Sequence, residues 1–131
     1  MAKKGAPKEG EFEEGKIWFR RRGKTITLGL TAAGVAEVGE VERIEMPGLE
    51  DRFDKGDVCL TVEGSNGNLE VPTPATGTVS SVNDNLNSAP ELASEDSDES
   101  GWLIEIDIED STELMEYGED EPDIEIGSGE D

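Results

Sequence analysis

The sequence predicts a mainly β fold, a small β-sandwich or flattened barrel with a few short helices. Short runs of alternating apolar and polar residues recur at close spacing, and turn residues separate them. Stretches with the period of a helix are few and short. A glycine followed by a short strand-like run occurs at Gly39 and again at Gly77, which indicates two related β-units.

The alternating runs divide the chain into a series of expected elements. Strands are expected at residues 16–20, 25–30, 39–46, 57–63, 78–83 and 101–108. Gly23 offers the turn of a first hairpin, because glycine accepts the backbone angles that tight turns need. Thr31 can cap a short helix over residues 32–36, which Gly34 weakens, and residues 110–118 have the pattern of a second short capped helix.

Length and composition indicate one domain with a tail at each end. A chain of 131 residues can bury one modest core. Residues 1–15 are polar and lack periodicity, so we expect a flexible arm there, followed by the folded domain at residues 16–118. Residues 119–131 are acidic and rich in glycine and serine, and we expect them to be disordered.

The charge balance restricts the class of partner. The chain has 33 acidic and 11 basic residues, a net charge of −22 and no histidine. Such a chain repels nucleic acids and anionic membranes, so neither is expected as a partner. Two explanations of the acidity remain open: adaptation to high salt with high solubility, or an acidic tail that docks on a basic protein.

Several kinds of chemistry are not expected from the residues present. Cys59 is the single cysteine, so no internal disulfide is possible and a cytoplasmic location is favoured. In its strand-like run we expect Cys59 to be a small buried residue. No apolar run approaches the ~20 residues of a membrane span, and no signal peptide is expected. Without histidine or a cysteine pair, we expect no transition-metal site and no catalytic residue, so the chain is not expected to be an enzyme.

Residues 61–71 predict a hairpin on which the functional argument depends. Asn66-Gly67 between two strand-like runs is a strong hairpin signal, because both residues accept the positive φ of a type I′ turn. Elsewhere, Trp18 and Trp102 are expected to be core or interface anchors in strands. The run Arg20-Arg21-Arg22 is expected to bind acidic segments of the same chain.

Several short blocks of the sequence, between about Trp18 and Tyr117, have the motifs of a known family in the same order. Two of them are Pro74 and Gly77 in a Pro-x-x-Gly-x-Val motif and Gly101-Trp102 before a strand. All the blocks together are residues 28–31, 39–47, 53–57, 62–63, 74–79, 82–92 and 101–104. With these blocks in order, the sequence resembles the H protein of the glycine cleavage system, the subunit that carries lipoate.

This resemblance implies the barrel-sandwich hybrid fold of lipoyl and biotinyl domains, two small sheets related by a pseudo-two-fold axis. It also implies a lysine at the tip of the central hairpin, but the hairpin here is Glu63, Gly64, Ser65, Asn66 and Gly67. The lysine position falls on Asn66, and Pro74 and Gly77 stay in register without a gap. Along the chain the nearest lysine is Lys55, which we expect at the far end of the preceding strand.

The resemblance and the missing lysine together lead to two hypotheses. The first is a non-catalytic, non-lipoylated H-protein-like subunit that binds or assembles a multi-component enzyme complex, with no cofactor. Its predicted partner contacts are Glu63, Asn66 and Glu70. The alternative is a lipoyl carrier that shuttles an aminomethyl or acyl group, with lipoate as its cofactor.

Overall fold

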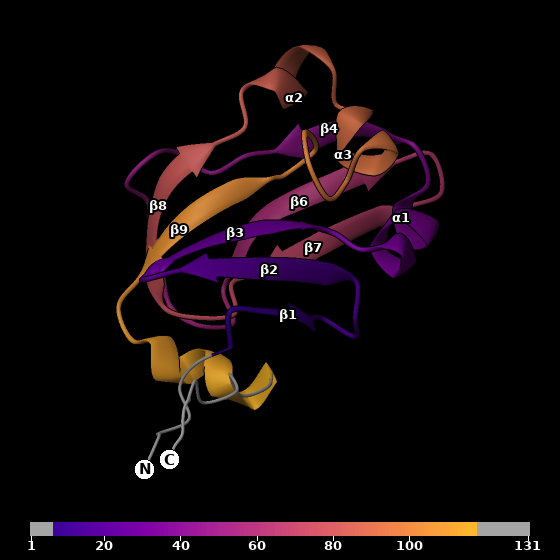
Figure 1. The fold of residues 1–131 in the computed structure, drawn as a ribbon. Helices are drawn as coiled ribbons and strands as arrows, with labels where there is room; N and C mark the ends of the chain where they lie inside the picture. The colour runs from indigo at the N-terminus through magenta and orange to yellow at the C-terminus, as the bar shows by residue number, and fades with distance from the viewer. Residues whose placement is uncertain (1–6, 118–131) are drawn as a thin grey trace.

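The computed structural model describes residues 7–117, which form two antiparallel sheets packed around one core (Figure 1). One sheet has six strands in the order β1-β2-β3-β9-β8-β5, and the other has three in the order β4-β6-β7. The elements are β1 (Glu9–Phe12), β2 (Ile17–Arg22), β3 (Thr25–Leu30), α1 (Ala32–Val38), β4 (Val41–Glu45), β5 (Arg52–Phe53), β6 (Val58–Gly64), β7 (Asn68–Pro72), β8 (Gly77–Val82), α2 (Asn85–Ser88), α3 (Leu92–Glu95), β9 (Ile104–Ile108) and the 3₁₀ helix η1 (Ser111–Tyr117). The predicted mainly β fold with a few short helices is confirmed.

Alternation along the strands explains how the six-stranded sheet buries one face. In β9, Ile104, Ile106 and Ile108 are buried, whereas Asp107 between them is exposed. Successive side chains of a strand point to opposite faces, so one face of this sheet lies on the core and the other faces outward. The core also takes residues from the three-stranded sheet, such as Val62, which is fully buried.

The predicted cap of the first helix is present and ties two distant segments together. The Thr31 hydroxyl oxygen accepts a hydrogen bond from the Gly34 amide at 3.1 Å and donates one to the Gly15 carbonyl at 2.6 Å. Gly34 packs so tightly that a Cβ there would lie 2.1 Å from the Lys16 carbonyl oxygen. The glycine that weakens the helix is therefore what lets α1 approach the start of β2.

The predicted flexible arm at residues 1–15 is wrong over Glu9–Phe12, which form strand β1 and pair with β2. Phe12 is buried, and its ring packs against those of Phe19 and Tyr117 at centroid distances of 6.3 and 5.9 Å. Phe12 is the one buried side chain of β1, and a single apolar residue does not produce the alternating pattern by which a strand is predicted. Residues 1–6 and the predicted acidic tail at 119–131 lie outside the described residues.

Two predicted boundaries near the C-terminus also change. The strand expected at residues 101–108 begins only at Ile104, and Trp102 lies in the loop before it. That loop is held by buried Asn83, whose side-chain amide donates to the carbonyls of Ser100 and Trp102 at 2.8 Å each. The helix expected at residues 110–118 is the 3₁₀ helix η1, preceded by Asp110, whose carboxylate accepts a hydrogen bond from the Thr112 amide at 3.0 Å.

Candidate functional site

The hairpin of β6 and β7 ends in a four-residue loop. Glu63 pairs with Asn68 across the hairpin, which leaves residues 64–67 to connect the strands. The Gly64 amide donates a hydrogen bond to the Gly67 carbonyl at 3.0 Å and closes the loop. We call residues 64–67 the hairpin tip.

The hairpin tip does not project freely, because it is bonded to the segment between α1 and β4. The Ser65 amide donates to the Glu40 carbonyl at 2.9 Å, and the Asn66 amide donates to the Val38 carbonyl at 2.8 Å. In return, the Ser65 hydroxyl oxygen accepts a hydrogen bond from the Glu40 amide at 3.1 Å. Three hydrogen bonds thus join two segments that lie about 25 residues apart in the chain.

These bonds explain why the predicted type I′ turn is wrong although the predicted hairpin is confirmed. A type I′ turn needs positive φ at both central residues, but neither Asn66 nor Gly67 has one. The positive φ falls instead on Gly39, at 76°, in the segment on which the tip rests. The tip adopts the conformation that directs its amides toward carbonyls of residues 38–40.

Two glycines make this close contact possible. A Cβ on Gly64 would lie 2.3 Å from the Val38 carbonyl oxygen, and a Cβ on Gly39 would lie 2.5 Å from the Ser65 hydroxyl oxygen. Side chains at either position would force the two segments apart. Gly67 is different, since a Cβ there would lie 3.8 Å from the Glu37 carbonyl oxygen, an ordinary contact.

The exposed part of the tip is formed by Ser65 and Asn66. Within residues 7–117 the Asn66 carboxamide makes no hydrogen bond to a neighbour. Its nitrogen lone pair is delocalised into the carbonyl group, so it is not a nucleophile and cannot be acylated under the conditions that acylate an amine. It can still donate and accept hydrogen bonds to a partner.

The two predicted contact residues beside the tip differ in their surroundings. Glu63 forms an ion pair with Arg43 of the neighbouring strand β4 at 3.0 Å, and 28% of its side chain is exposed. Glu70 is exposed on β7 and makes no side-chain hydrogen bond or ion pair with the rest of the described chain. Glu63 therefore has a structural role of its own, and the partner contacts at Glu63, Asn66 and Glu70 stay predictions.

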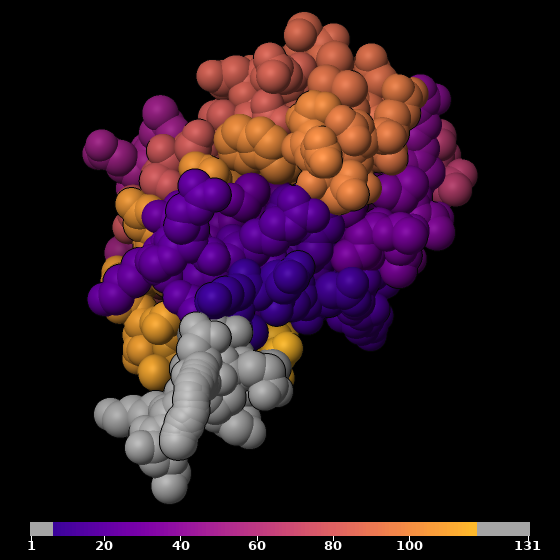
Figure 2. Space-filling view, viewed as in Figure 1, coloured from indigo at the N-terminus to yellow at the C-terminus, as the bar shows by residue number. Residues whose placement is uncertain are grey.

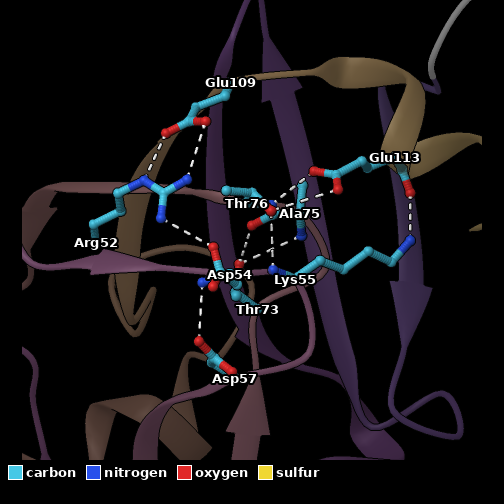
Figure 3. Close-up of polar contacts among 9 residues, drawn as sticks. All are labelled: Arg52, Asp54, Lys55, Asp57, Thr73, Ala75, Thr76, Glu109 and Glu113. Atoms are coloured by element: carbon cyan, nitrogen blue, oxygen red, sulfur yellow. Dashed lines mark hydrogen bonds and ion pairs between the residues drawn. The ribbon is translucent and has the colours of Figure 1, made fainter.

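Lys55 lies far from the hairpin tip and is held by the C-terminal 3₁₀ helix. Its ammonium group donates to the Glu113 carbonyl at 2.8 Å, pairs with the Glu116 carboxylate and lies 5.3 Å from the ring centroid of Tyr117. Figure 3 shows the surrounding network, in which the Thr76 amide donates to the Glu113 carboxylate at 2.8 Å. In the same view Arg52 donates to Glu109 at 2.9 Å and lowers the pKa of that carboxyl.

Lys16 lies at the same end of the molecule as the tip. Its position cannot be found by counting residues along the chain, because the two segments are distant in sequence. Its ammonium group lies 3.6 Å from the Glu37 carboxylate, and the Glu37 carbonyl oxygen is the neighbour of Gly67 described above. Desolvation alone would lower the pKa of Lys16, but the Glu37 and Glu14 carboxylates raise it on balance. Two neighbouring carboxylates thus stabilise the Lys16 ammonium group.

Arg20, the first residue of the arginine run, binds an acidic loop of the same chain through a backbone oxygen. Arg20 lies 4.2 Å from the ring centroid of Trp18 and donates to the Asp98 carbonyl at 2.7 Å. The Trp18 indole donates to the Ser97 carbonyl at 3.1 Å. Figure 2 shows the result on the surface, where the orange loop lies against the violet strands.

Cys59 is the small buried residue that the sequence predicts. It is 3% exposed, and its thiol donates to the Val71 carbonyl at 3.4 Å. Burial raises the pKa of the thiol to about 12, so it is neutral at physiological pH. A neutral, buried thiol is a poor nucleophile.

The described chain shows neither a cluster for a metal ion nor a helix that could span a membrane. Among residues 7–117 no group of three or more Cys, Asp or Glu side chains is placed to hold a metal ion. Within that same range, no helix is long and apolar enough to cross a membrane.

Comparisons with known proteins assign this fold and its hairpin to a family. The family model described as glycine cleavage H-protein matches residues 10–125. The chain belongs to the glycine cleavage H-protein family. As a member of this family it is 34% identical over 108 residues to the glycine cleavage system H protein of Anaeromyxobacter sp. (strain K), which covers 82% of this chain and 84% of that protein. It is 28% identical over 110 residues to that of Staphylococcus saprophyticus, covering 84% and 87%.

A solved structure supports the fold assignment of this family member. The crystal structure of a glycine cleavage system H protein from Mycobacterium marinum superposes with a TM-score of 0.71. The match covers 79% of this chain and 85% of the other, at 19% sequence identity. At that identity the likeness establishes the shared fold.

Proposed function

We propose that this family member is a non-catalytic, non-lipoylated binding or assembly subunit of a multi-component enzyme complex in the cytoplasm. The observation that carries the proposal is Asn66 at the tip of the central hairpin. The family resemblance places the lipoyl-lysine at that position, and a carboxamide cannot take its place in acylation. The tip is bonded to residues 38–40, which supports a fixed surface for a partner at this position.

Lys55 and Lys16, the lysines considered above as shifted attachment sites, both support this proposal. Acylation requires a deprotonated ε-amine that forms an amide bond as the activating group leaves and one proton is lost. Lys55 is bonded to Glu113 and Glu116 at the far end of β6. Lys16 is nearer to the tip but is paired with the carboxylates of Glu14 and Glu37, and its ammonium group would have to leave both to be acylated.

The test combines acylation and co-purification. We expect the intact mass of the protein from its native source to equal that of the unmodified chain. With an active lipoate ligase, the unmodified chain should gain no mass, whereas Asn66→Lys should gain one lipoyl group. Asn68→Lys is the matched control, because it adds the same amine at an exposed residue on the strand just beyond the tip.

Co-purification tests the assembly role separately. A tagged chain should retain subunits of one enzyme complex, and replacing the exposed Glu70 by Arg should weaken that retention more than the same change at Glu42 of β4 does. A tagged chain that retains no stable partner would refute the assembly role. Equal effects of the two replacements would refute the contact predicted at Glu70.

The alternative function, a lipoyl carrier, is favoured by family membership and by the position of Lys16, which pairs with Glu37, a neighbour of Gly67 in the tip. Under this alternative the native protein carries a lipoyl mass, and peptide mapping should place it on Lys16. Lys16→Arg would then remove the added mass while keeping the ion pairs with Glu14 and Glu37. A lipoyl mass on any lysine of the native protein refutes the proposal above.

A further inference from the structure

A cluster of basic residues surrounds the turn between β2 and β3 on this strongly acidic protein. The Lys8 carbonyl accepts a hydrogen bond from the Arg21 amide at 2.6 Å, which places Lys8 beside the arginine run. Lys24 occupies the turn after Gly23. We call these residues the basic patch: Lys8, Arg20, Arg21, Arg22 and Lys24, which are five of the 11 basic residues of the chain.

Three cations of the basic patch, Arg20, Arg22 and Lys24, form no ion pair within residues 7–117. Arg20 donates to the neutral carbonyl of Asp98 and stacks on Trp18. Arg22 is exposed and makes no side-chain hydrogen bond or ion pair with any other residue from 7 to 117. Lys24 is also exposed and contributes, as the smallest of several causes, to lowering the pKa of the Asp110 carboxyl.

Acidic side chains of the domain lie along the patch. Glu9 pairs with Arg20 across β1 and β2. The carboxylate-bearing residues Asp98, Glu99 and Glu105 line a groove of about 570 Å³ together with Arg20, Arg21 and Arg22. β1 begins at Glu9 and does not extend to Arg22. Arg22 is exposed and forms no ion pair with these acids within residues 7–117, so it can bind an acidic ligand.

The described chain ends next to this patch. Tyr117 packs on Phe19 at a ring centroid distance of 6.0 Å, and its carbonyl oxygen lies 3.4 Å from the Cβ position of Gly10. Gly10 pairs with Phe19, which immediately precedes Arg20. From Phe19 to Arg22 the strand rises by roughly 10 Å, at about 3.3 Å per residue. Tyr117 lies with Phe19 on the core side of β2, whereas the side chains of Arg20 and Arg22 point to the opposite face, so the chain after Tyr117 would have to pass around the edge of the sheet to reach them. Residues 118–131 have a fully extended length of roughly 46–50 Å, which is enough for that path.

The segment that follows Tyr117 has the complementary charge. It lies outside the described residues, and its sequence contains seven acids and no base. These acids are Glu119, Asp120, Glu121, Asp123, Glu125, Glu130 and Asp131.

We propose that residues 119–131 bind the basic patch of the same molecule. Each exposed ion pair contributes at most about 1 kcal/mol, but tethering gives the segment an effective concentration of roughly millimolar or more. Several weak pairs then suffice for binding at low ionic strength. Because these charges are exposed, salt above about 0.1 M screens the interaction. The inference does not depend on whether the protein carries lipoate.

The experiment measures the ¹⁵N–¹H signals of the full chain at 20 mM and 500 mM NaCl. The tail variant neutralises four acids: Glu119→Gln, Asp120→Asn, Glu121→Gln and Asp123→Asn. The control variant makes the same charge change at four exposed acids outside the six-stranded sheet: Glu40→Gln, Glu42→Gln, Glu70→Gln and Asp84→Asn. We expect the backbone and guanidinium signals of Arg22, and the backbone signals of Lys24, to shift with salt in the wild type and the control. In the tail variant that salt-dependent shift should be lost.

The possible outcomes separate the proposal from its competitors. A synthetic peptide of residues 118–131 added to the tail variant should restore the low-salt positions of the Arg22 and Lys24 signals in a saturable way. Shifts that grow with protein concentration would assign the acidic ligand to a second copy and overturn the intramolecular contact. Equal losses in the tail and control variants would show a general effect of net charge and also overturn it.

Discussion

The contact between the hairpin tip and the segment after α1 predicts that two neighbouring glycines respond oppositely to a methyl group. Gly64→Ala places a Cβ 2.3 Å from the Val38 carbonyl oxygen and 3.0 Å from the Glu40 carbonyl oxygen. Backbone atoms cannot rotate away as a side chain does, so the two segments must separate. Gly67→Ala adds the same methyl group at the same tip, where the nearest atom lies 3.8 Å away.

The magnitudes follow from the bonds at stake. Separation weakens the hydrogen bonds from the Ser65 and Asn66 amides, each of which contributes about 1 kcal/mol net. Residual overpacking adds about 1–2 kcal/mol. We therefore expect Gly64→Ala to lower the free energy of unfolding by about 2–4 kcal/mol. Gly67→Ala should leave it unchanged or raise it by up to about 1 kcal/mol, because alanine restricts the unfolded chain.

Equilibrium unfolding in urea, followed by tryptophan fluorescence, measures both changes. Amide hydrogen exchange of Ser65 and Asn66 adds a local measurement and should accelerate in Gly64→Ala alone. The reasoning is refuted if Gly64→Ala is as stable as Gly67→Ala. It is also refuted if Gly67→Ala loses about 1–2 kcal/mol, the penalty that a positive φ at that position would impose on alanine.

Three further predictions test the charges and the core. Burial raises the pKa of Cys59 from 9.0 to about 12, so the thiol ionises first in the unfolded state, and the stability present below pH 9 is lost as the pH rises toward 12. Between pH 8 and 10 the free energy of unfolding, measured in urea, should fall by about 1.4 kcal/mol more in the wild type than in Cys59→Ala. Parallel pH profiles of the two proteins would contradict this. The net charge of −22 makes the acidic side chains of the folded protein repel one another. Raising NaCl from 0.05 to 1 M screens this repulsion and should raise the free energy of unfolding, measured in urea, by at least about 1 kcal/mol. A fall in that free energy would show that surface ion pairs outweigh the repulsion. Lys55→Met should lower the free energy of unfolding by about 1 kcal/mol, because it removes the bonds to Glu113 and Glu116. Lys24→Met is the same change at an exposed lysine and should alter that free energy by less than about 0.5 kcal/mol. Equal losses in the two variants would refute the role of Lys55.

Much of the candidate site could be predicted because its signals are local. The hairpin follows from two strand-like runs around Asn66-Gly67, and the cap of α1 follows from Thr31 before a helical turn. The buried state of Cys59 follows from its place in an apolar run. Each of these depends on residues within a few positions of one another, where side-chain period and backbone preference act directly.

Other features depend on contacts between distant segments. Strand β1 forms because Phe12 reaches Phe19 and Tyr117, although its own residues lack a strand pattern. Lys16 lies at the same end of the molecule as the hairpin tip, because α1 packs against the Lys16 backbone at Gly34. A count of residues along the chain indicates Lys55 as the nearest lysine instead.

The hairpin shows where the division falls. The sequence by itself determined that a hairpin spans residues 61–71, that Asn66 stands at its tip and that no amine is available at that residue. Only the tertiary structure decided the conformation of the tip, because the backbone amides of Ser65 and Asn66 bond to carbonyls of residues 38–40. Those hydrogen bonds outweigh the local preference of Asn66-Gly67 for a type I′ turn, since a bond to a distant segment leaves no signal in the turn itself.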